Sequence, residues 1–448
     1  AIVEKSVAGP GFINLKLSDA WLYEQAARQA HDPAFGTSPT GAGKTVVIDF
    51  SSPNVAKRMH IGHMRSTHIG HALCGLHRAA GWTVVGDNHI GDWGTQFGKL
   101  IVAYHLWLDR AAYAEDPIGE LERIYVQFGN EVAVDDATPP EKRAEAAALM
   151  DRARAETLKL QRGDAENTAL WKEFLQVSLA EFEQVYQRMG VRFDVVLGES
   201  AYAGQMDEMV ERLVQSGLAE ESQGALIIRF TEPELKDHPM IVRKKDGAAN
   251  YATTDLACIR YRQDRWNPAK ILYVTDMRQQ LHFQQLFAVA RRWELRPELI
   301  HAWFGMLVLP EGAMSTRKGN VIRLVDLLDE AVRRARAVVD QKSPELPEED
   351  RAKIAEAVGV SAVRYADLSQ HPQTNVTFDW DRMLSLEGNT APYLLYSHAR
   401  GASLLARAGH PPDLGALRTK HPLERTLLLT AMRTPEAVQA ALRSVRPN

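Results

Sequence analysis

The chain has 448 residues, of which 45% are hydrophobic and 25% are charged, and its formal net charge is −4 at pH 7. This length is too great for one hydrophobic core and predicts two or three domains. The composition excludes a surface that is basic throughout, a disulfide scaffold and a long apolar membrane span, so any nucleic-acid contact must come from local patches.

The first part of the chain predicts a strand-containing segment, a short helix and a linker. Residues 2–19 alternate in hydrophobicity around a Gly-Pro-Gly turn, and residues 20–45 begin as a helix and continue as a Gly/Pro/Ser/Thr-rich linker. The Gly-Lys-Thr at 43–45 matches the end of a phosphate-binding loop. However, Ser38 stands where the first glycine of that pattern belongs, and the apolar strand follows the motif instead of preceding it. We interpret the motif as a flexible lead into a strand.

The next stretch predicts the start of a nucleotide-binding unit. Residues 45–50 are a β-branched apolar run typical of a buried strand, and a helix follows a turn. His60 and His63 lie three apart near the start of this helix, and Gly62 leaves room for a flat ring against the backbone. Two imidazoles beside helix-end N–H groups suit the stabilisation of charge on a phosphate during nucleotidyl transfer.

The histidines allow another interpretation. His68, His71 and His77 follow on the same helix, so the segment could bind a metal or could present exposed imidazoles. Cys74 and Cys258 form no C-x-x-C pair, so a structural zinc site is not expected.

The segment up to Gly86 reads strand, helix, strand, which is the unit of a parallel doubly wound sheet with ligands at the carboxyl ends of its strands. Residues 87–98 form the next strand-end loop, which we expect to line the site. Residues 139–190 are charged and helical, with a break at Gly163 and a cap at Gly190, and predict an inserted helical subdomain.

Strand character resumes at 192–198 and at 225–230, and the chain after Asp326 is mostly helical.

Several segments, in chain order, resemble the arginyl-tRNA synthetases of class I. HIGH after a strand and a proline-containing loop resembles the first class I signature, and SSPNVAKRMHIGHMRST with DNHIGDWGTQFGKL resembles the arginyl enzymes. RKKDGAANYATTDLACIRYR, VTDMRQQLHFQQL, FGMLVLPEGAMSTRKGNVIRLVDLL and FDWDRMLSLEGNTAPYLLYSHAR resemble the later blocks of that family. The resemblance covers nearly the whole chain.

The resemblance implies an α/β fold. Residues 45–330 would form the catalytic domain, a doubly wound, Rossmann-like parallel sheet of the HIGH type, with a largely helical connective insertion at 105–200. Residues 1–20 would be the remnant of an N-terminal RNA-contacting domain, 21–44 a linker, and 331–448 a helical stem with an incomplete all-α anticodon-binding domain.

The resemblance also implies an arginine site. A guanidinium is planar and always charged, and it is best held by carboxylates in a partly dry pocket. Tyr251 and Asp255 are four residues apart, on one face of a predicted helix. In the family, the positions that hold the substrate arginine match Asp49, Asn54, Tyr251, Asp255 and Gln279. At Asp49 the family often has glutamate, and a cap or turn carboxylate is the alternative there.

For ATP, the resemblance implies contacts from both class I signatures. The first supplies His60, Gly62 and His63. The second, KMSKS in the class, is AMSTR here and would supply Met314 and Ser315.

In this second signature Thr316 replaces the usual catalytic lysine. Arginyl enzymes with this replacement have a lysine just before HIGH, which is Lys57 here. Its charge would stabilise the transition state, with Arg317 and Lys318 as auxiliary cations unless they belong to an ordinary basic loop.

The implied reaction is arginylation of tRNA in two steps. ATP, with Mg²⁺, gives an arginyl-adenylate, and the 2′-hydroxyl of the terminal adenosine of tRNA specific for arginine then takes the arginyl group. The first step is expected to depend on tRNA. We expect a cytoplasmic monomer with no membrane partner.

Two alternatives stay open. One is another class I specificity, for lysine, glutamine or cysteine. The other is a tRNA-binding fragment inactive in aminoacylation. Basic residues in the C-terminal segment could contact phosphates or could form a solvated helix face; they are Arg400, Arg407, Arg418, Lys420, Arg425, Arg443 and Arg446.

Overall fold

The structure is a computed structural model that describes residues 1–448 except 246, 248–249, 294, 310–311, 314–321 and 410–412. Five parallel strands form its central sheet, in the order β10, β9, β3, β4, β5. Their bounds are β3 Thr45–Asp49, β4 Thr83–Asn88, β5 Val195–Val196, β9 Lys270–Tyr273 and β10 Glu298–His301. The strand order reverses between β3 and β9, and ligands of such sheets bind at this point.

Both faces of the sheet are covered by helices because the strands are apolar on both sides. Val46 and Ile48 of β3 pack into one hydrophobic cluster with helix α2 (Ile61–Ala79). Val47 lies in the other cluster, with α9 (Tyr251–Trp266) and α10 (Gln280–Arg292). The predicted doubly wound α/β fold is therefore confirmed.

The predicted strand at 45–50 and the helix after it are confirmed, with one shift. The helix begins at Ile61, because the preceding His60 is its N-cap with extended backbone at φ −111°. Gly81, just beyond the helix end, has φ +77°. The motif at 43–45 follows a short 3₁₀ turn, η1 (Pro39–Gly41), and leads into β3, so it is not a phosphate-binding loop.

The helical insertion has its own core and consists of α3 (Thr95–Trp107), α4 (Arg110–Glu115), α5 (Pro117–Glu131), α6 (Pro140–Gln161) and α7 (Ala165–Met189). Its first helix begins inside the segment predicted as loop 87–98, after Gly94 at φ +107°. The break and the cap are where the sequence predicts them. Gly163 has φ +77°, and Gly190 is a left-handed C-cap.

Two small sheets flank the centre. One is antiparallel, with β6 (Glu220–Ser222), β7 (Ala225–Ile228) and β8 (Met240–Arg243), and lies beside η2 (Glu199–Gln205) and α8 (Met206–Gln215). The other joins β11 (Leu307–Leu309) to β12 (Gly312–Ala313) and to β13 (Val376–Thr377). The strands predicted at 192–198 and 225–230 are thus present in shorter form.

The N-terminal part is the hairpin β1 (Ile2–Ala8) and β2 (Phe12–Leu17), followed by α1 (Asp19–His31). The C-terminal helices are α11 (Leu324–Lys342), α12 (Glu348–Leu368), α13 (Trp380–Met383), α14 (Ala391–Ala408), α15 (Pro422–Ala431) and α16 (Thr434–Ser444), with the short turns η3 (Met277–Gln279) and η5 (Leu414–Ala416) elsewhere. The N-terminal helix lies beside α15 of the C-terminal part, whereas the last helix, α16, packs against α2.

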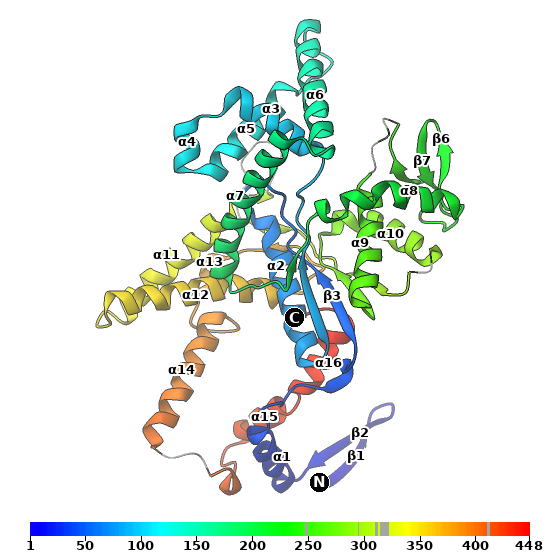
Figure 1. Cartoon of the computed structure of the whole chain (residues 1–448). Coiled ribbons are helices and arrows are strands. Elements are labelled where there is room, and N and C mark those ends of the chain that lie inside the picture. Colours follow the sequence, from blue (N-terminus) through cyan, green and yellow to red (C-terminus); the bar gives the residue numbers. More distant parts are fainter. Residues whose placement is uncertain (246, 248–249, 294, 310–311, 314–321, 410–412) are drawn as a thin grey trace.

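Figure 1 shows an elongated molecule, with the insertion at one end and the hairpin, α1, α14 and α15 at the other. Within the described part of the chain, no helix is long and apolar enough to cross a membrane.

Candidate active site

His60 and His63 form a fixed pair at the start of α2. The Gly62 N–H donates to His60 Nδ1 at 3.0 Å, and the His60 N–H donates to His63 Nδ1 at 3.1 Å. The two ring centroids are 3.9 Å apart. A Cβ at position 62 would lie 2.6 Å from His60 Cε1. Gly62 therefore leaves room for a flat ring against the backbone, and the ring of His60 lies there.

Both imidazoles are neutral at pH 7. Burial lowers the pKa of His60, and the charges of Lys57 and Arg278 lower it further. Burial and the neighbouring His60 lower the pKa of His63 to about 3. In a neutral imidazole whose Nδ1 accepts a backbone N–H, the proton is on Nε2. Each ring therefore has an Nε2–H donor that these capping bonds do not use.

A cleft of about 250 Å³ opens in front of this pair. It lies at the carboxyl ends of β3 and β9, where the strand order reverses. Its lining brings together five of the predicted site residues: Asn54, His60, Gly62, His63 and Gln279. Its opposite wall is the segment 304–307, which the sequence analysis does not identify as part of the site.

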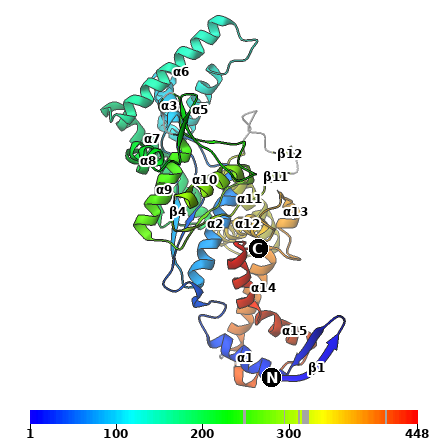
Figure 2. The same ribbon diagram turned by 90° about the vertical axis from the view of Figure 1, so that its right-hand side faces the viewer.

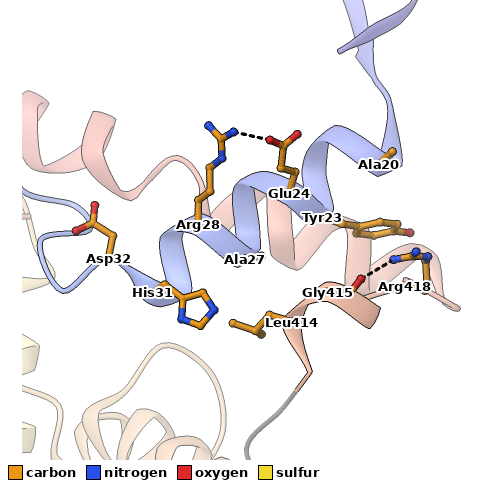
Figure 3. Close-up of a pocket in the computed structure, with 10 residues that line it drawn as sticks. All are labelled: Ala20, Tyr23, Glu24, Ala27, Arg28, His31, Asp32, Leu414, Gly415 and Arg418. Carbon is orange, nitrogen blue, oxygen red and sulfur yellow. Dashed lines mark hydrogen bonds and ion pairs between the residues drawn. The ribbon is translucent and has the colours of Figure 1, made fainter.

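A larger cavity, of about 780 Å³, lies away from these residues (Figure 3). It is formed between α1 and η5, and its lining includes Tyr23, His31 and Arg418. Within it Arg28 is paired with Glu24 at 2.5 Å. None of the predicted catalytic residues lines this cavity.

Tyr251 and Asp255 lie on one face of α9, as predicted. His282 of α10 joins them: its Nε2 is 2.7 Å from Asp255 Oδ2, and its ring packs edge-on against that of Tyr251 at 4.9 Å. Tyr251 is 59% exposed and is open to a ligand. His282 was missed by sequence reasoning, although it lies three residues after Gln279.

A second carboxyl group belongs to this region. Burial and the negative charges of Asp255 and Asp92 raise the pKa of Glu199 to about 7, against the opposing effect of His89. Asp92 in turn accepts bonds from the N–H and hydroxyl of Ser200, at 2.8 and 2.6 Å. Burial is the main cause of this raised pKa, and the neighbouring carboxyl groups of Asp255 and Asp92 add to it. A region with three carboxyl groups that act on one another suits a cationic ligand.

Asp49 has a partner other than the expected one. Its Oδ2 accepts a bond from Nη2 of Arg262 at 2.7 Å, and the same nitrogen donates to Asp87 at 2.7 Å. Asp49 Oδ1 accepts from the Ser52 hydroxyl at 3.0 Å. The sequence correctly indicates that a carboxylate here needs a cation, but that cation is the fully buried Arg262 of the protein itself.

Lys57 lies against the helical insertion. Its Nζ is 4.5 Å from the ring centroid of Tyr125 on α5. Burial lowers the pKa of Lys57, with Glu122 acting in the opposite direction. Lys57 lies three residues before His60, and its charge lowers the pKa of both His60 and His63.

The predicted residues of the second signature lie outside the described residues; they are Met314, Ser315, Thr316, Arg317 and Lys318. The segment that follows them is bonded to the histidine motif. The Ile61 N–H donates to the carbonyl of Ile322 at 3.1 Å, and the Leu324 N–H donates to that of Met59 at 2.9 Å.

Known proteins have similar sequences. The family model "tRNA synthetases class I (R), catalytic domain" matches residues 30–380. An arginine–tRNA ligase of Fusobacterium nucleatum is 46% identical over 455 residues, covering 100% of this chain and 77% of that protein. One from Chloroflexus aggregans is also 46% identical, covering 98% of this chain and 76% of that protein.

Solved structures are similar as well. The arginyl-tRNA synthetase of Thermus thermophilus has a TM-score of 0.80 at 25% identity, covering 100% of this chain and 77% of that one. The Plasmodium falciparum arginyl-tRNA synthetase has a TM-score of 0.78 at 24% identity, covering 99% of this chain and 75% of that one.

Proposed function

The chain belongs to the class I arginyl-tRNA synthetases and is an arginine–tRNA ligase that uses ATP, and we propose that the cleft in front of His60 and His63 is where arginine is activated. The observation that carries this proposal is the fixed histidine pair, whose Nε2–H groups are not used by the capping bonds. The similarity to arginine–tRNA ligases over the full chain does not favour another amino-acid specificity or an inactive binding fragment.

In the first step, a carboxylate oxygen of arginine attacks the α-phosphorus of ATP, and the bond to the bridging oxygen of pyrophosphate breaks. Negative charge grows on the phosphate oxygens. His60 and His63 stabilise it as neutral hydrogen-bond donors, which are already oriented before the reaction and need no rearrangement. Their lowered pKa values support this role, because neither ring is protonated at pH 7.

Lys57 supplies positive charge to the same transition state. Its effect on the pKa of both histidines supports this role. Arg317 and Lys318 remain further candidates, with Met314 and Ser315 as ATP contacts. ATP would bring Mg²⁺ as its counter-ion. The described residues include no group of three or more His, Cys, Asp or Glu that could hold a metal, so we assign it no protein ligands.

Arginine is held from two sides. Its guanidinium lies between Asp255 and Glu199 and against the exposed ring of Tyr251, since carboxylates bind this planar cation through paired hydrogen bonds. Asn54 and Gln279, which line the cleft, contact the amino acid nearer the phosphate. Asp49 keeps Arg262 in place beneath the site.

In the second step, the 2′-hydroxyl of the terminal adenosine attacks the carbonyl carbon of the arginyl-adenylate, and AMP leaves. Residues 331–448 meet the body of the tRNA. Tyr393, Tyr396 and Arg400 on α14 support this, because all three are exposed and offer stacking faces and charge to RNA. We place the reaction in the cytoplasm, consistent with two buried free thiols, and in a monomer.

The test is arginine-dependent exchange of pyrophosphate into ATP, with and without tRNA specific for arginine. Lysine, glutamine and cysteine serve as control substrates. We expect exchange with arginine and its tRNA together, and a loss of about 100-fold when His60 is changed to Ala, which is comparable to removing a preorganised donor to a developing charge. Full exchange by His60→Ala would show that the cleft is not the site of activation.

A further inference from the structure

Arg65 lies on the catalytic helix α2, two residues beyond His63, and only 1% of it is exposed. Its guanidinium does not bond to its own helix. Nε donates to Asp367 Oδ1 of α12 at 2.8 Å, and Nη1 donates to the carbonyls of Gly305 at 2.6 Å and of Thr374 at 3.1 Å. One side chain therefore joins the helix that carries the histidine pair to α12 and to two further segments.

Gly305 belongs to the wall of the ATP cleft opposite the histidines. This wall is built against the segment 371–378, which follows α12. The Gly305 N–H donates to the Pro372 carbonyl at 2.9 Å, and the Met306 N–H donates to Asn375 Oδ1 at 2.8 Å. Beyond these residues β11 pairs with β13.

The contact between the wall and segment 371–378 is close. A Cβ at position 305 would lie 2.4 Å from the Thr374 carbonyl oxygen, so the two backbones touch where Arg65 bonds to both. Figure 2 shows α12 beside α2, the helix that Arg65 comes from. The distance between the wall and the histidine pair therefore depends on how Arg65 holds this contact.

Stability alone does not account for this arrangement. Asp367 is 0% exposed, and burying two charges costs so much desolvation that an apolar pair of similar volume often serves as well. What an apolar pair cannot provide is a planar donor that reaches a carboxylate and two carbonyls at fixed angles. The bonds of Arg65 to the Gly305 and Thr374 carbonyls are therefore best explained by a need to hold these two backbone segments in a fixed position relative to α2.

We propose that Arg65 is a positioning residue for ATP, which fixes the wall at Gly305 relative to the histidine pair on its own helix. The proposal rests on the proposed function, since it takes this cleft as the ATP site. Arg65 is itself among the residues that line the cleft, but with only 1% of it exposed it does not have to touch the nucleotide for this role. It acts through the backbone at Gly305 and through segment 371–378, which follows α12.

The test is Arg65→Lys, which keeps a positive charge beside Asp367 but loses the fork that reaches the two carbonyls. In arginine-dependent pyrophosphate exchange we expect the KM for ATP to rise about tenfold, as for the loss of one good hydrogen bond. The KM for arginine should stay within about twofold, and the melting temperature should fall by only a few degrees. A purely structural role would lower the melting temperature and leave the two KM values in their original ratio.

Arg188→Lys is the matched control. Arg188 joins α7 to α11 and α12 through Asp329 at 2.5 Å and Glu356 at 2.7 Å, and it does not line the cleft. Its replacement should change neither KM. If Arg188→Lys raised the KM for ATP as much as Arg65→Lys does, the positioning role of Arg65 would be overturned. Loosening any ion pair at α12 would then be enough to weaken ATP binding.

A double variant guards against a folding failure. Arg65→Met with Asp367→Asn removes both buried charges together and keeps a polar partner for the buried His68, whose Nδ1 lies 3.3 Å from Asp367 Oδ2. This double variant should fold, yet it should bind ATP as weakly as Arg65→Lys. Normal ATP binding by the double variant would overturn the proposal. His60→Ala separates this outcome from a failure of the proposed function. If neither His60→Ala nor Arg65→Lys changes the use of ATP in pyrophosphate exchange, the cleft is wrongly assigned. If only His60→Ala changes it, the cleft is correctly assigned and the role of Arg65 is wrong.

Discussion

At the scale of single residues, Glu199 links arginine binding to pH. Its pKa of about 7 is raised from the ordinary 4.5, so the folded protein holds this proton more tightly than the unfolded chain does. The contribution of this proton to the stability of the folded state is complete below pH 4.5 and is lost as the pH rises through 7. A bound guanidinium would favour the charged carboxylate and reverse this preference.

We therefore predict that arginine binding releases a proton and strengthens as the pH rises from about 5 to about 8. Calorimetric titration in buffers of different ionisation enthalpy measures the released proton. Glu199→Gln should bind arginine more weakly and without this pH dependence. An unchanged pH dependence in Glu199→Gln would assign the titration to another group.

Asp255 is the firmest candidate for the guanidinium, because His282 orients it and Tyr251 lies beside it. Asp255→Ala should raise the KM for arginine by about 10- to 100-fold, equivalent to a charge-assisted hydrogen bond of about 1.5–3 kcal/mol. The KM for ATP should change much less. Asp264→Ala, on the same helix with only a loose pair to Arg260 at 3.9 Å, is the control. Equal changes for both substrates would contradict the assignment.

At the scale of elements, the helical insertion supplies the surface on which Lys57 rests. Lys57→Ala should lower kcat for exchange with little effect on arginine binding. Tyr125→Leu removes the aromatic face beneath the ammonium group and should lower kcat by a smaller factor, about threefold to tenfold for a partly buried cation–π contact. Tyr125→Phe keeps that face and serves as the control. If Lys57→Ala keeps its kcat, the missing charge must come from Arg317 or Lys318.

The elements also show what the sequence could and could not predict. The strand at 45–50 and the cap at Gly190 follow from local periodicity and from backbone preferences, which neighbouring residues encode. The partners of the buried arginines could not be predicted in this way. Arg262 binds Asp49 across 213 positions and Arg65 binds Asp367 across 302. Only the fold brings these charges together, and so the sequence identified Asp49 as needing a cation without identifying Arg262.

The same limit applies within the site. The resemblance supplied His60, His63 and Gln279, which line one cleft, because these residues belong to motifs. The wall at 304–307 begins a block that resembles the family, but nothing in that block marks these residues as part of the site, and Glu199 lies outside every such block. Their roles depend on where β11 and η2 begin in space, and on burial, and a local sequence pattern reports neither.

At the scale of the whole molecule, the N-terminal segment is joined to α15. Arg425 of α15 pairs with Asp19 at 2.8 Å and donates to the carbonyl of Leu17. We predict that Arg425→Ala loosens this contact by about 1 kcal/mol, as expected for a partly exposed ion pair. Faster amide exchange in α1, with an unchanged KM for arginine, would be the expected result. Arg433→Ala, at an exposed pair within the C-terminal helices, should leave the exchange of α1 unchanged.

The contact between Tyr23 and Thr419 cannot form until long after α1 has been synthesised. The hydroxyl of Tyr23 lies 2.7 Å from that of Thr419, and 396 positions separate the two residues along the chain. At a translation rate of about 5–20 residues per second, α1 leaves the ribosome roughly 20 to 80 s before its partner exists. Throughout that interval its docking face is open to water, to other nascent chains and to chaperones. Helices made much later thus complete the packing of α1, and a ribosome that stalls before α15 would leave α1 without its partner.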